Sequence, residues 1–204
     1  MRVWTAEEVR KFLDVTAEHR LGPLFALTAM TGMRRGEVLG LQWADVDLDD
    51  QMVTVRRARV AVGYEVATGT PKSGEGRRID LDDRTVTALK GWRRLQREER
   101  LRVGAEWVDS SYVFTDEFGK AMHPHSVAGY FDRAVRESGL PSLNFHGLRH
   151  SHATVLLRAG VPVRVVAERL GHADPAMTLR VYQHVVPGMQ RDAAARAAEI
   201  VFGS

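Results

Sequence analysis

The sequence contains no cysteine, and it lacks several other features that define large classes of protein. Without cysteine, the chain forms no disulfide and offers no thiolate to a metal ion. No apolar run approaches the roughly 18 residues that a membrane-spanning helix needs. The first residues, MRVWTAEEVRKFL, have neither the apolar core nor the cleavage site of a secretory signal. These absences favour a cytoplasmic protein that does not enter a membrane.

The chain is long enough for a sizeable core but carries little net charge. Its 204 residues suffice for one large domain or two small ones, and 44% of them are hydrophobic. The net charge of +3 is too small to establish nucleic-acid binding. Residues 84–102 nevertheless include seven Lys or Arg against two Glu. Such a cluster suits contacts with phosphates, although a solvated helix face has the same composition.

Caps, breakers and hydrophobic periodicity predict one α+β domain, mostly helical, with a small antiparallel sheet or ribbon. The sequence shows no repeats, low-complexity tract or long linker. The expected helices are 5–19, 23–32, 34–41, 82–102, 123–138, 145–160, 162–170, one that begins at 174–175 and carries Tyr182, and 189–201. The expected strands are 51–62, an alternating return within 63–81 that places Lys72 on a turn, and a short extended piece at 110–116.

Four separate segments carry residues that suit one chemistry. They are TGMRRGEVLGLQW with Arg34 and Glu37, TPKSGEGRR with Lys72, FHGLRHSHAT with His146, Arg149 and His150, and LGHADPAMTLRVYQH with His172 and Tyr182. His146 and Arg149 stand three residues apart, so they share a face of the predicted helix. The Gly before His172 ends a helix and frees that side chain from helix packing.

Together these side chains could attack a phosphodiester without a metal. Arg34 and Arg149 could hold one phosphate through paired N–H donors and neutralise the charge that its oxygens gain in a transition state. Nearby positive charge favours the phenolate of Tyr182, which makes it a usable nucleophile. Lys72 could protonate the leaving oxygen. No acidic cluster suitable for Mg²⁺ stands beside these residues, so we expect no metal and no cofactor.

Each residue also has a plainer interpretation. Tyr182 alone would be a core aromatic, and a Lys on a Gly/Ser turn such as Lys72 is usually just solvated. His146 and His150 have the i,i+4 spacing of metal ligands, but a zincin helix carries Glu after its first His, where this chain has Gly147. His150 is therefore expected to support the pocket rather than to bind a metal.

The four segments resemble those of the tyrosine recombinases, also called the phage integrase family. The family motifs are TGxR followed by Glu, a Lys on a β-hairpin, HxxR followed by His, LGH, and a Tyr about ten residues later. All occur here in order, and the resemblance extends from VWTAEEVRKFL to YQHVVPGMQRDAA. It implies a tyrosine recombinase catalytic fold and site-specific cleavage and rejoining of DNA strands through a 3′-phosphotyrosyl intermediate.

The resemblance also implies a role for each residue. These roles are phosphate binding by Arg34 and Arg149, protonation of the 5′ oxygen by Lys72, acceptance of the Tyr proton by His146, contact with the scissile phosphate by His172, nucleophilic attack by Tyr182, and support of the first Arg by Glu37. Family members usually have an N-terminal core-binding domain, which the sequence lacks, so residues 1–204 are expected to be the catalytic domain alone. The implied partners are double-stranded DNA and further copies of the chain. Those copies would form a homotetramer on paired recombination sites, linked by the C-terminal helix, and an accessory directionality factor is left open.

Three other functions compete with this one. A type IB topoisomerase shares the chemistry but would relax DNA rather than recombine it. A catalytically inactive DNA-binding module would lack Tyr182, Arg34 or Arg149, and none is lost here. A metal hydrolase would need carboxylate ligands near the His cluster and would be sensitive to EDTA.

On DNA, we expect phosphate contacts from Arg and Lys, with base reading by helix 125–138 or the basic helix 84–102.

Overall fold

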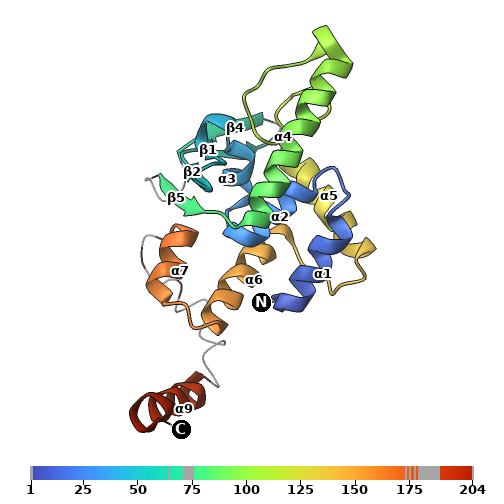
Figure 1. Cartoon of the computed structure of the whole chain (residues 1–204). Coiled ribbons are helices and arrows are strands. Elements are labelled where there is room, and N and C mark those ends of the chain that lie inside the picture. Colours follow the sequence, from blue (N-terminus) through green and yellow to red (C-terminus); the bar gives the residue numbers. More distant parts are fainter. Residues whose placement is uncertain are drawn as a thin grey trace.

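The computed structural model describes residues 2–63, 65–70, 76–172, 174, 176, 178 and 189–203, which form a mostly helical α+β fold (Figure 1). Its α-helices are α1 (Ala6–Thr16), α2 (Gly22–Thr31), α3 (Arg35–Gly40), α4 (Asp83–Val103), α5 (Pro124–Glu137), α6 (Phe145–Arg158), α7 (Val163–Leu170) and α9 (Met189–Phe202). Its strands are β1 (Val46–Asp47), β2 (Met52–Val55), β3 (Ala58–Val62), β4 (Glu65–Gly69) and β5 (Arg77–Asp80). Two 3-10 turns, η1 (Trp43–Asp45) and η2 (Gly104–Glu106), complete the described elements.

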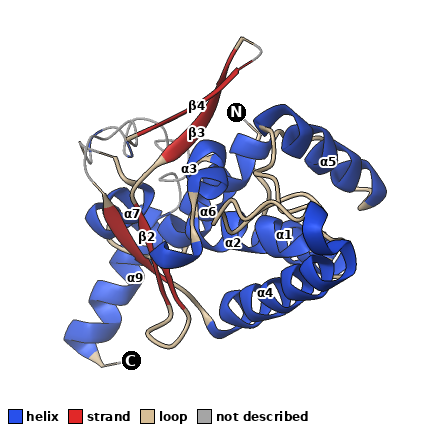
Figure 2. Cartoon of the chain, turned by 90° about the horizontal axis from the view of Figure 1, so that it is seen from above, coloured by secondary structure: helices blue, strands red, loops and turns tan. Residues whose placement is uncertain are grey.

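The first two helices begin and end at the signals that the sequence contains. Thr5 and Glu8 form the predicted capping box of α1, although the helix ends at Thr16 rather than His19. Gly32 ends α2 with a φ of +65°, a left-handed conformation that favours glycine. α2 packs against α1, α3, α4 and α6, so it lies at the centre of the core (Figure 2).

The small antiparallel sheet is present, but the segment 51–62 is not one strand, because it divides between two sheets. β2 pairs antiparallel with β1 and β5, whereas β3 pairs antiparallel with β4 in a separate hairpin (Figure 2). The break falls at Arg56 and Arg57. The Arg57 guanidinium donates to Gln42 Oε1 at 2.6 Å and to Asp45 Oδ2 at 2.7 Å, which ties the break to the loop after α3.

Small residues allow α3 to lie directly beneath β3. A Cβ on Gly36 would stand 2.8 Å from the Arg59 carbonyl oxygen, and a Cβ on Gly40 would stand 2.8 Å from that of Arg57. Larger residues at either position would push the strand away from the helix. The GEVLG sequence after Arg34 therefore fixes the hairpin close to the element that carries Arg34.

The segment 110–116 is not the expected strand. It forms only isolated bridges, Gln42 with Tyr112 and Thr115 with Ala121. The Val113 carbonyl accepts hydrogen bonds from the Trp92 indole and the Gln96 amide of α4, so side chains of α4 occupy an acceptor that a strand partner would use.

The N-terminal segment is anchored between α5 and α6. Trp4 packs in an aromatic cluster with Phe12, Phe25, Phe131 and Phe145. Its indole donates to the Pro141 carbonyl, and its backbone N–H donates to Ser151 Oγ at 2.9 Å. This cluster holds α6 against α1 and α5, and α6 is the helix that carries His146 and Arg149.

The last helix projects from the main body and approaches it near Gly160, where an added Cβ would stand 3.4 Å from the Arg196 guanidinium (Figure 1). In α9, the exposed fractions of Ile200, Val201 and Phe202 are 84%, 70% and 81%. Within the described part of the chain, no helix is long and apolar enough to cross a bilayer.

Candidate active site

Arg34 is fixed by the helix that follows it. It is the N-cap residue of α3, and its backbone N–H donates to Glu37 Oε2 at 2.8 Å. Its guanidinium Nη1 donates to Glu37 Oε1 at 2.8 Å, and Nη2 donates to the Gly171 carbonyl at 3.4 Å. The side chain remains 27% exposed. Glu37 therefore fixes a guanidinium that solvent can still reach, and its role in supporting a catalytic Arg34 stays a prediction.

Arg149 enters the same region from α6 and is almost fully buried. Only 2% of the residue is exposed, and its Nη1 donates to the Gly32 carbonyl at 2.7 Å. Gly32 itself has no room for a side chain, since a Cβ there would stand 2.6 Å from Leu170 Cδ2 and 2.8 Å from His152 Cδ2. The TGMR turn thus presents Arg34 and, through the carbonyl of Gly32, also holds Arg149.

The first turn of α6 places His146 beside His150. Asn144 caps this helix by accepting from the Gly147 N–H at 2.9 Å. A Cβ on Gly147 would stand 2.4 Å from Leu143, so only glycine fits after His146. The His146 and His150 rings meet edge to face with centroids 4.6 Å apart. His150 therefore packs directly against the His146 ring, and its supporting role stays a prediction.

His172 is placed by the turn that ends α7. Gly171 adopts a φ of +67°, and the His172 N–H donates to the Ala167 carbonyl at 3.0 Å. The His172 Nδ1 lies 2.7 Å from Thr178 Oγ1. This contact fixes the ring orientation, because the second ring nitrogen must point away from Thr178.

The guanidinium groups make this region strongly positive and keep the imidazole of His172 neutral. Burial, followed by the charges of Arg149, Arg34 and Arg77, lowers the pKa of His172 to about 4. A guanidinium stays charged at any ordinary pH. The site therefore holds fixed positive charge beside a neutral imidazole at pH 7.

The other two imidazoles respond in the same direction. Burial lowers the pKa of His150 to about 4, with further contributions from His146 and Arg149. Burial also lowers the pKa of His146, and the charges of Arg149 and Arg34 lower it further against the opposing effect of Glu37. A neutral His146 is the form that can accept a proton.

One residue of this region was missed by the sequence analysis. Arg77, at the start of β5, donates to both oxygens of Glu37, at 3.0 and 2.7 Å. Its Nε donates to the Arg169 carbonyl at 3.0 Å. No sequence signal pointed to Arg77, because the burial of Glu37 that calls for a second cation is seen only in the structure.

A second arginine holds α7 in place. Arg169 Nη2 donates to the carbonyls of Met30 and Asp80, at 3.0 and 2.9 Å, and its Nε donates to His152 Nε2 at 3.3 Å. These bonds join α7 to α2, β5 and α6. The turn that bears His172 is thereby tied to the elements that bear Arg34 and Arg149.

The structure brings together six of the predicted site residues. These are Arg34, Glu37, His146, Arg149, His150 and His172. Lys72 and Tyr182 lie outside the described residues, so their predicted roles stay predictions. Among the side chains that are described, no three His, Cys, Asp or Glu residues are grouped as metal ligands would be.

Comparisons with known proteins agree with this fold. The Phage integrase family model matches residues 2–188. A XerC-like tyrosine recombinase of Caldanaerobacter subterraneus subsp. tengcongensis is 32% identical over 206 residues, which cover 95% of this chain and 53% of that protein. The ICEBs1 integrase of Bacillus subtilis is 26% identical over 98% of this chain and 55% of its own length. The chain thus spans about half the length of these curated relatives.

A solved structure has the same architecture. The crystal structure of XerA recombinase superposes with a TM-score of 0.76 at 23% identity, over 97% of this chain and 65% of that one. This likeness shows the fold. The family match over residues 2–188 extends through the segments that carry Arg34, His146, Arg149 and His172, and the chain therefore belongs to the phage integrase family.

Proposed function

We propose that this chain is the catalytic domain of a site-specific DNA recombinase. It would cleave and rejoin DNA strands by metal-free transesterification through a 3′-phosphotyrosyl intermediate. The observation that carries the proposal is the convergence of Arg34 and Arg149 with three neutral imidazoles beside them. Fixed guanidinium groups of this kind stabilise the charge that develops on a phosphate under attack.

The chemistry balances without a cofactor. The Tyr182 oxygen attacks phosphorus as its proton passes to His146, and the bond between phosphorus and the 5′ oxygen breaks. Lys72 donates a proton to that departing oxygen, while Arg34, Arg149 and His172 bind the phosphate. One phosphodiester replaces another, so the bond energy is conserved in the protein–DNA link and is available for rejoining.

The hairpin and α5 support a DNA-binding face next to this region. α5 packs against β3 and α3, and Arg59 of β3 donates to the Met122 carbonyl just before α5. α4, the other helix predicted to read bases, packs against α2 instead. We therefore assign base reading to α5. The Tn1549 transposon integrase, of similar fold (TM-score 0.75, 21% identity), was solved in complex with transposon right end DNA.

The direct test is covalent capture in EDTA. The protein should become joined to DNA through Tyr182 and should exchange strands between two paired sites. Relaxation of supercoiled DNA without strand exchange would favour a type IB topoisomerase. DNA binding without any covalent product would favour an inactive binding module, and a reaction that EDTA abolishes would favour a metal hydrolase.

Binding of DNA should raise the pKa of His172. Burial, together with the charges of Arg149, Arg34 and Arg77, holds this pKa near 4 in the free protein. A bound phosphate offsets them, and an opposite charge within about 4–6 Å shifts a pKa by roughly 1–3 units. Imidazole NMR signals, titrated over pH with and without DNA, should therefore show protonation of His172 at higher pH in the complex.

His152 is the matched control for that titration. Burial and the charge of Arg169 lower its pKa to about 4 as well, with only a smaller contribution from Arg149 and none from Arg34. Its pKa should change little on DNA. Equal shifts of His152 and His172, or none at His172, would contradict phosphate binding at this position.

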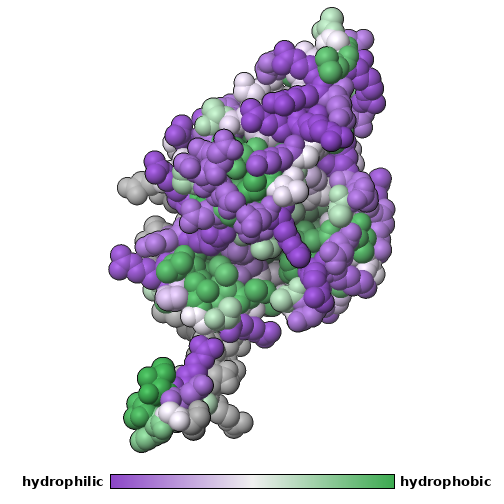
Figure 3. Space-filling view, in the orientation of Figure 1, coloured by the Kyte–Doolittle hydropathy of each residue, from purple (hydrophilic) through white to green (hydrophobic). Residues whose placement is uncertain are grey.

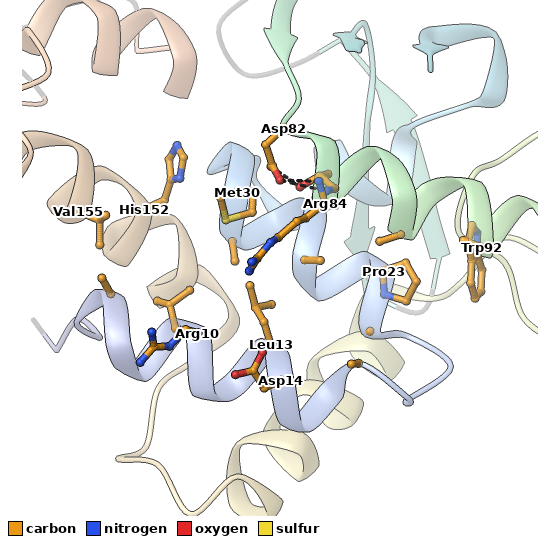
Figure 4. A pocket seen from close by; sticks show the side chains of 18 of the residues that line it. Arg10, Leu13, Asp14, Pro23, Met30, Asp82, Arg84, Trp92, His152 and Val155 are labelled. Carbon is orange, nitrogen blue, oxygen red and sulfur yellow. Dashed lines mark hydrogen bonds between the residues drawn. The ribbon is translucent and has the colours of Figure 1, made fainter. Parts of the chain in front are cut away.

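We further propose that copies of the chain assemble as a homotetramer on paired sites through α9. An apolar pocket of about 1010 Å³ opens between α1, α2, α4, α6 and α7. Figure 4 shows Leu13, Met30 and Val155 lining it, with Arg10, Asp14 and Arg84 around them.

Apolar side chains are visible on this face of the body and on α9 (Figure 3). The exposed end of α9, with Ile200, Val201 and Phe202, has the chemistry to fill the pocket of a neighbouring copy. An accessory directionality factor is compatible with this assembly.

The absence of cysteine makes this assembly testable by crosslinking. One preparation carries Phe202→Cys and another Val155→Cys, and the two are mixed with DNA before oxidation. We expect a disulfide between the two chains that depends on DNA. Leu101→Cys, an exposed position outside the pocket (85% exposed), is the control partner and should not crosslink. A third preparation carries both Phe202→Cys and Val155→Cys in one chain. If this preparation forms a disulfide within one chain while the mixed single variants form none between chains, exchange between copies is contradicted.

A further inference from the structure

The side chain of Arg77 makes three hydrogen bonds within the candidate active site, although its place in β5 requires only backbone pairing. It begins β5, and its side chain is only 11% exposed. Two of its nitrogens grip the two oxygens of Glu37, and Nε donates to the Arg169 carbonyl. The guanidinium also lies against Gly171, where an added Cβ would stand 2.7 Å from Nη1. One side chain thus contacts α3, α7 and the turn that precedes His172.

The carboxylate of Glu37 is shared between two arginines. Glu37 is 1% exposed and accepts from the backbone N–H of Arg34, from the Arg34 guanidinium and twice from Arg77. Burial by itself would raise the pKa of Glu37, but the bonds and charge of Arg77, together with those of Arg34, hold this pKa below its ordinary value. Glu37 is therefore ionised, and its single negative charge faces two guanidinium groups.

We propose that Arg77 is a positioning residue for the strand-cleavage chemistry, which acts through Glu37 on Arg34 and through Gly171 on the turn of His172. The inference rests on the proposed function and adds to it a residue that contacts no reacting atom. Its physical basis is the division of one carboxylate between two cations. When Arg77 is lost, the whole charge of Glu37 acts on Arg34.

Two consequences follow for Arg34. The buried carboxylate would draw its guanidinium inward, away from the exposed side where a phosphate would bind. The carboxylate would also cancel more of the positive potential that Arg34 presents to that phosphate. At the same time, loss of Arg77 leaves space beside Gly171, so the turn that orients His172 loses its packing partner.

The test compares Arg77→Gln and Arg77→Lys with Arg78→Gln. Arg78 is the next residue of β5 and is exposed, so its side chain lies on the opposite face of the strand. Single-turnover cleavage is measured at saturating DNA. We expect Arg77→Gln to cleave about 10–100-fold more slowly, because a misplacement of about 1 Å at a catalytic group can cost about 10²-fold in rate. Arg77→Lys, which keeps the charge but not the two-pronged bond, should fall between Arg77→Gln and wild type, and Arg78→Gln should match wild type.

A methylphosphonate at the scissile position separates positioning from general damage. This substitution replaces a charged non-bridging oxygen with a methyl group, so the reaction depends less on Arg34. If Arg77 acts through Arg34, the defect of Arg77→Gln should shrink severalfold on this DNA. A defect of the same size on both substrates, or equal rates for Arg77→Gln and Arg78→Gln on ordinary DNA, would overturn the proposal.

A second measurement does not depend on cleavage. NMR signals of the Arg34 guanidinium should shift in Arg77→Gln and in Arg77→Lys but not in Arg78→Gln, with thermal unfolding confirming that each variant is folded. If wild type itself does not cleave DNA, the proposed function fails, and these signals alone decide the role of Arg77. Unchanged Arg34 signals in both Arg77 variants would then overturn it.

Discussion

Arg149→Lys should slow DNA cleavage by about 10²–10³-fold while DNA affinity changes little. Lysine keeps the positive charge, so long-range attraction to the DNA backbone is retained. It does not keep the planar fork with which a guanidinium binds two oxygens of one phosphate. The loss should therefore appear in the chemical step, where charge develops on those oxygens, and not in the binding of the ground state.

The burial of Arg149 adds a structural reason. Its Nη1 donates to the Gly32 carbonyl at 2.7 Å, so one edge of the guanidinium is used to fix its own position. The shorter reach and single nitrogen of lysine cannot make that bond and bind a phosphate together. The effect should therefore exceed that of losing one ordinary surface contact.

Arg158→Lys is the matched control because Arg158 lies at the exposed end of the same helix. Single-turnover cleavage at saturating DNA and thermal unfolding should be measured for both variants. A rate for Arg149→Lys within threefold of wild type, or a loss explained wholly by weaker DNA binding, would contradict the role proposed for Arg149.

The helices could be predicted from the sequence because their ends are encoded locally. Three helices begin at side-chain caps: α1 at Thr5 with Glu8, α4 at Asp82 and α6 at Asn144. The helix α2 ends at Gly32. Each of these signals depends on residues within one turn of the helix end. The helix predicted for 162–170 begins one residue later, because Pro162 is the N-cap of α7.

The sheets were harder to predict because their division depends on contacts that are distant in sequence. The run 51–62 is rich in β-branched residues and shows no turn signal, so it reads as one strand. Its break at Arg57 follows from bonds to Gln42 and Asp45, which no local pattern reveals. The strand predicted at 110–116 failed for the same reason. The side chains of Trp92 and Gln96 donate to the Val113 carbonyl, and this contact between distant residues cannot be read from the local pattern.

The candidate site shows a similar division. Arg34, His146, Arg149 and His172 belong to motifs with fixed spacing, so the sequence identified them together. Arg77 belongs to no such motif, and its importance appears only when Glu37 is seen to be buried between two guanidinium groups. Local spacing can identify residues that belong to a shared motif, whereas the residues that hold them in place come from tertiary packing.

The role of Tyr182 is the central claim, and it predicts the largest effect of any substitution. Phenylalanine keeps the ring but removes the only atom that can attack phosphorus, so Tyr182→Phe should form no covalent product at all. The other tyrosines, Tyr64, Tyr112 and Tyr130, are retained in that variant and serve as internal controls. Tyr112 is a useful control because it also has a cation beside it: the Arg59 guanidinium lies over its ring, 4.9 Å from the ring centroid.

The most direct measurement is therefore covalent capture of DNA by wild type and by Tyr182→Phe. Nicked duplexes with a randomised central sequence are incubated with each protein in EDTA, at concentrations where fluorescence anisotropy shows saturated binding. Denaturing gels then reveal any adduct, and mass spectrometry after nuclease digestion locates it. We expect an adduct of wild type attached at Tyr182 and none with Tyr182→Phe, although both proteins bind DNA equally. Saturated binding by wild type without an adduct, or an adduct that persists in Tyr182→Phe, would contradict the account.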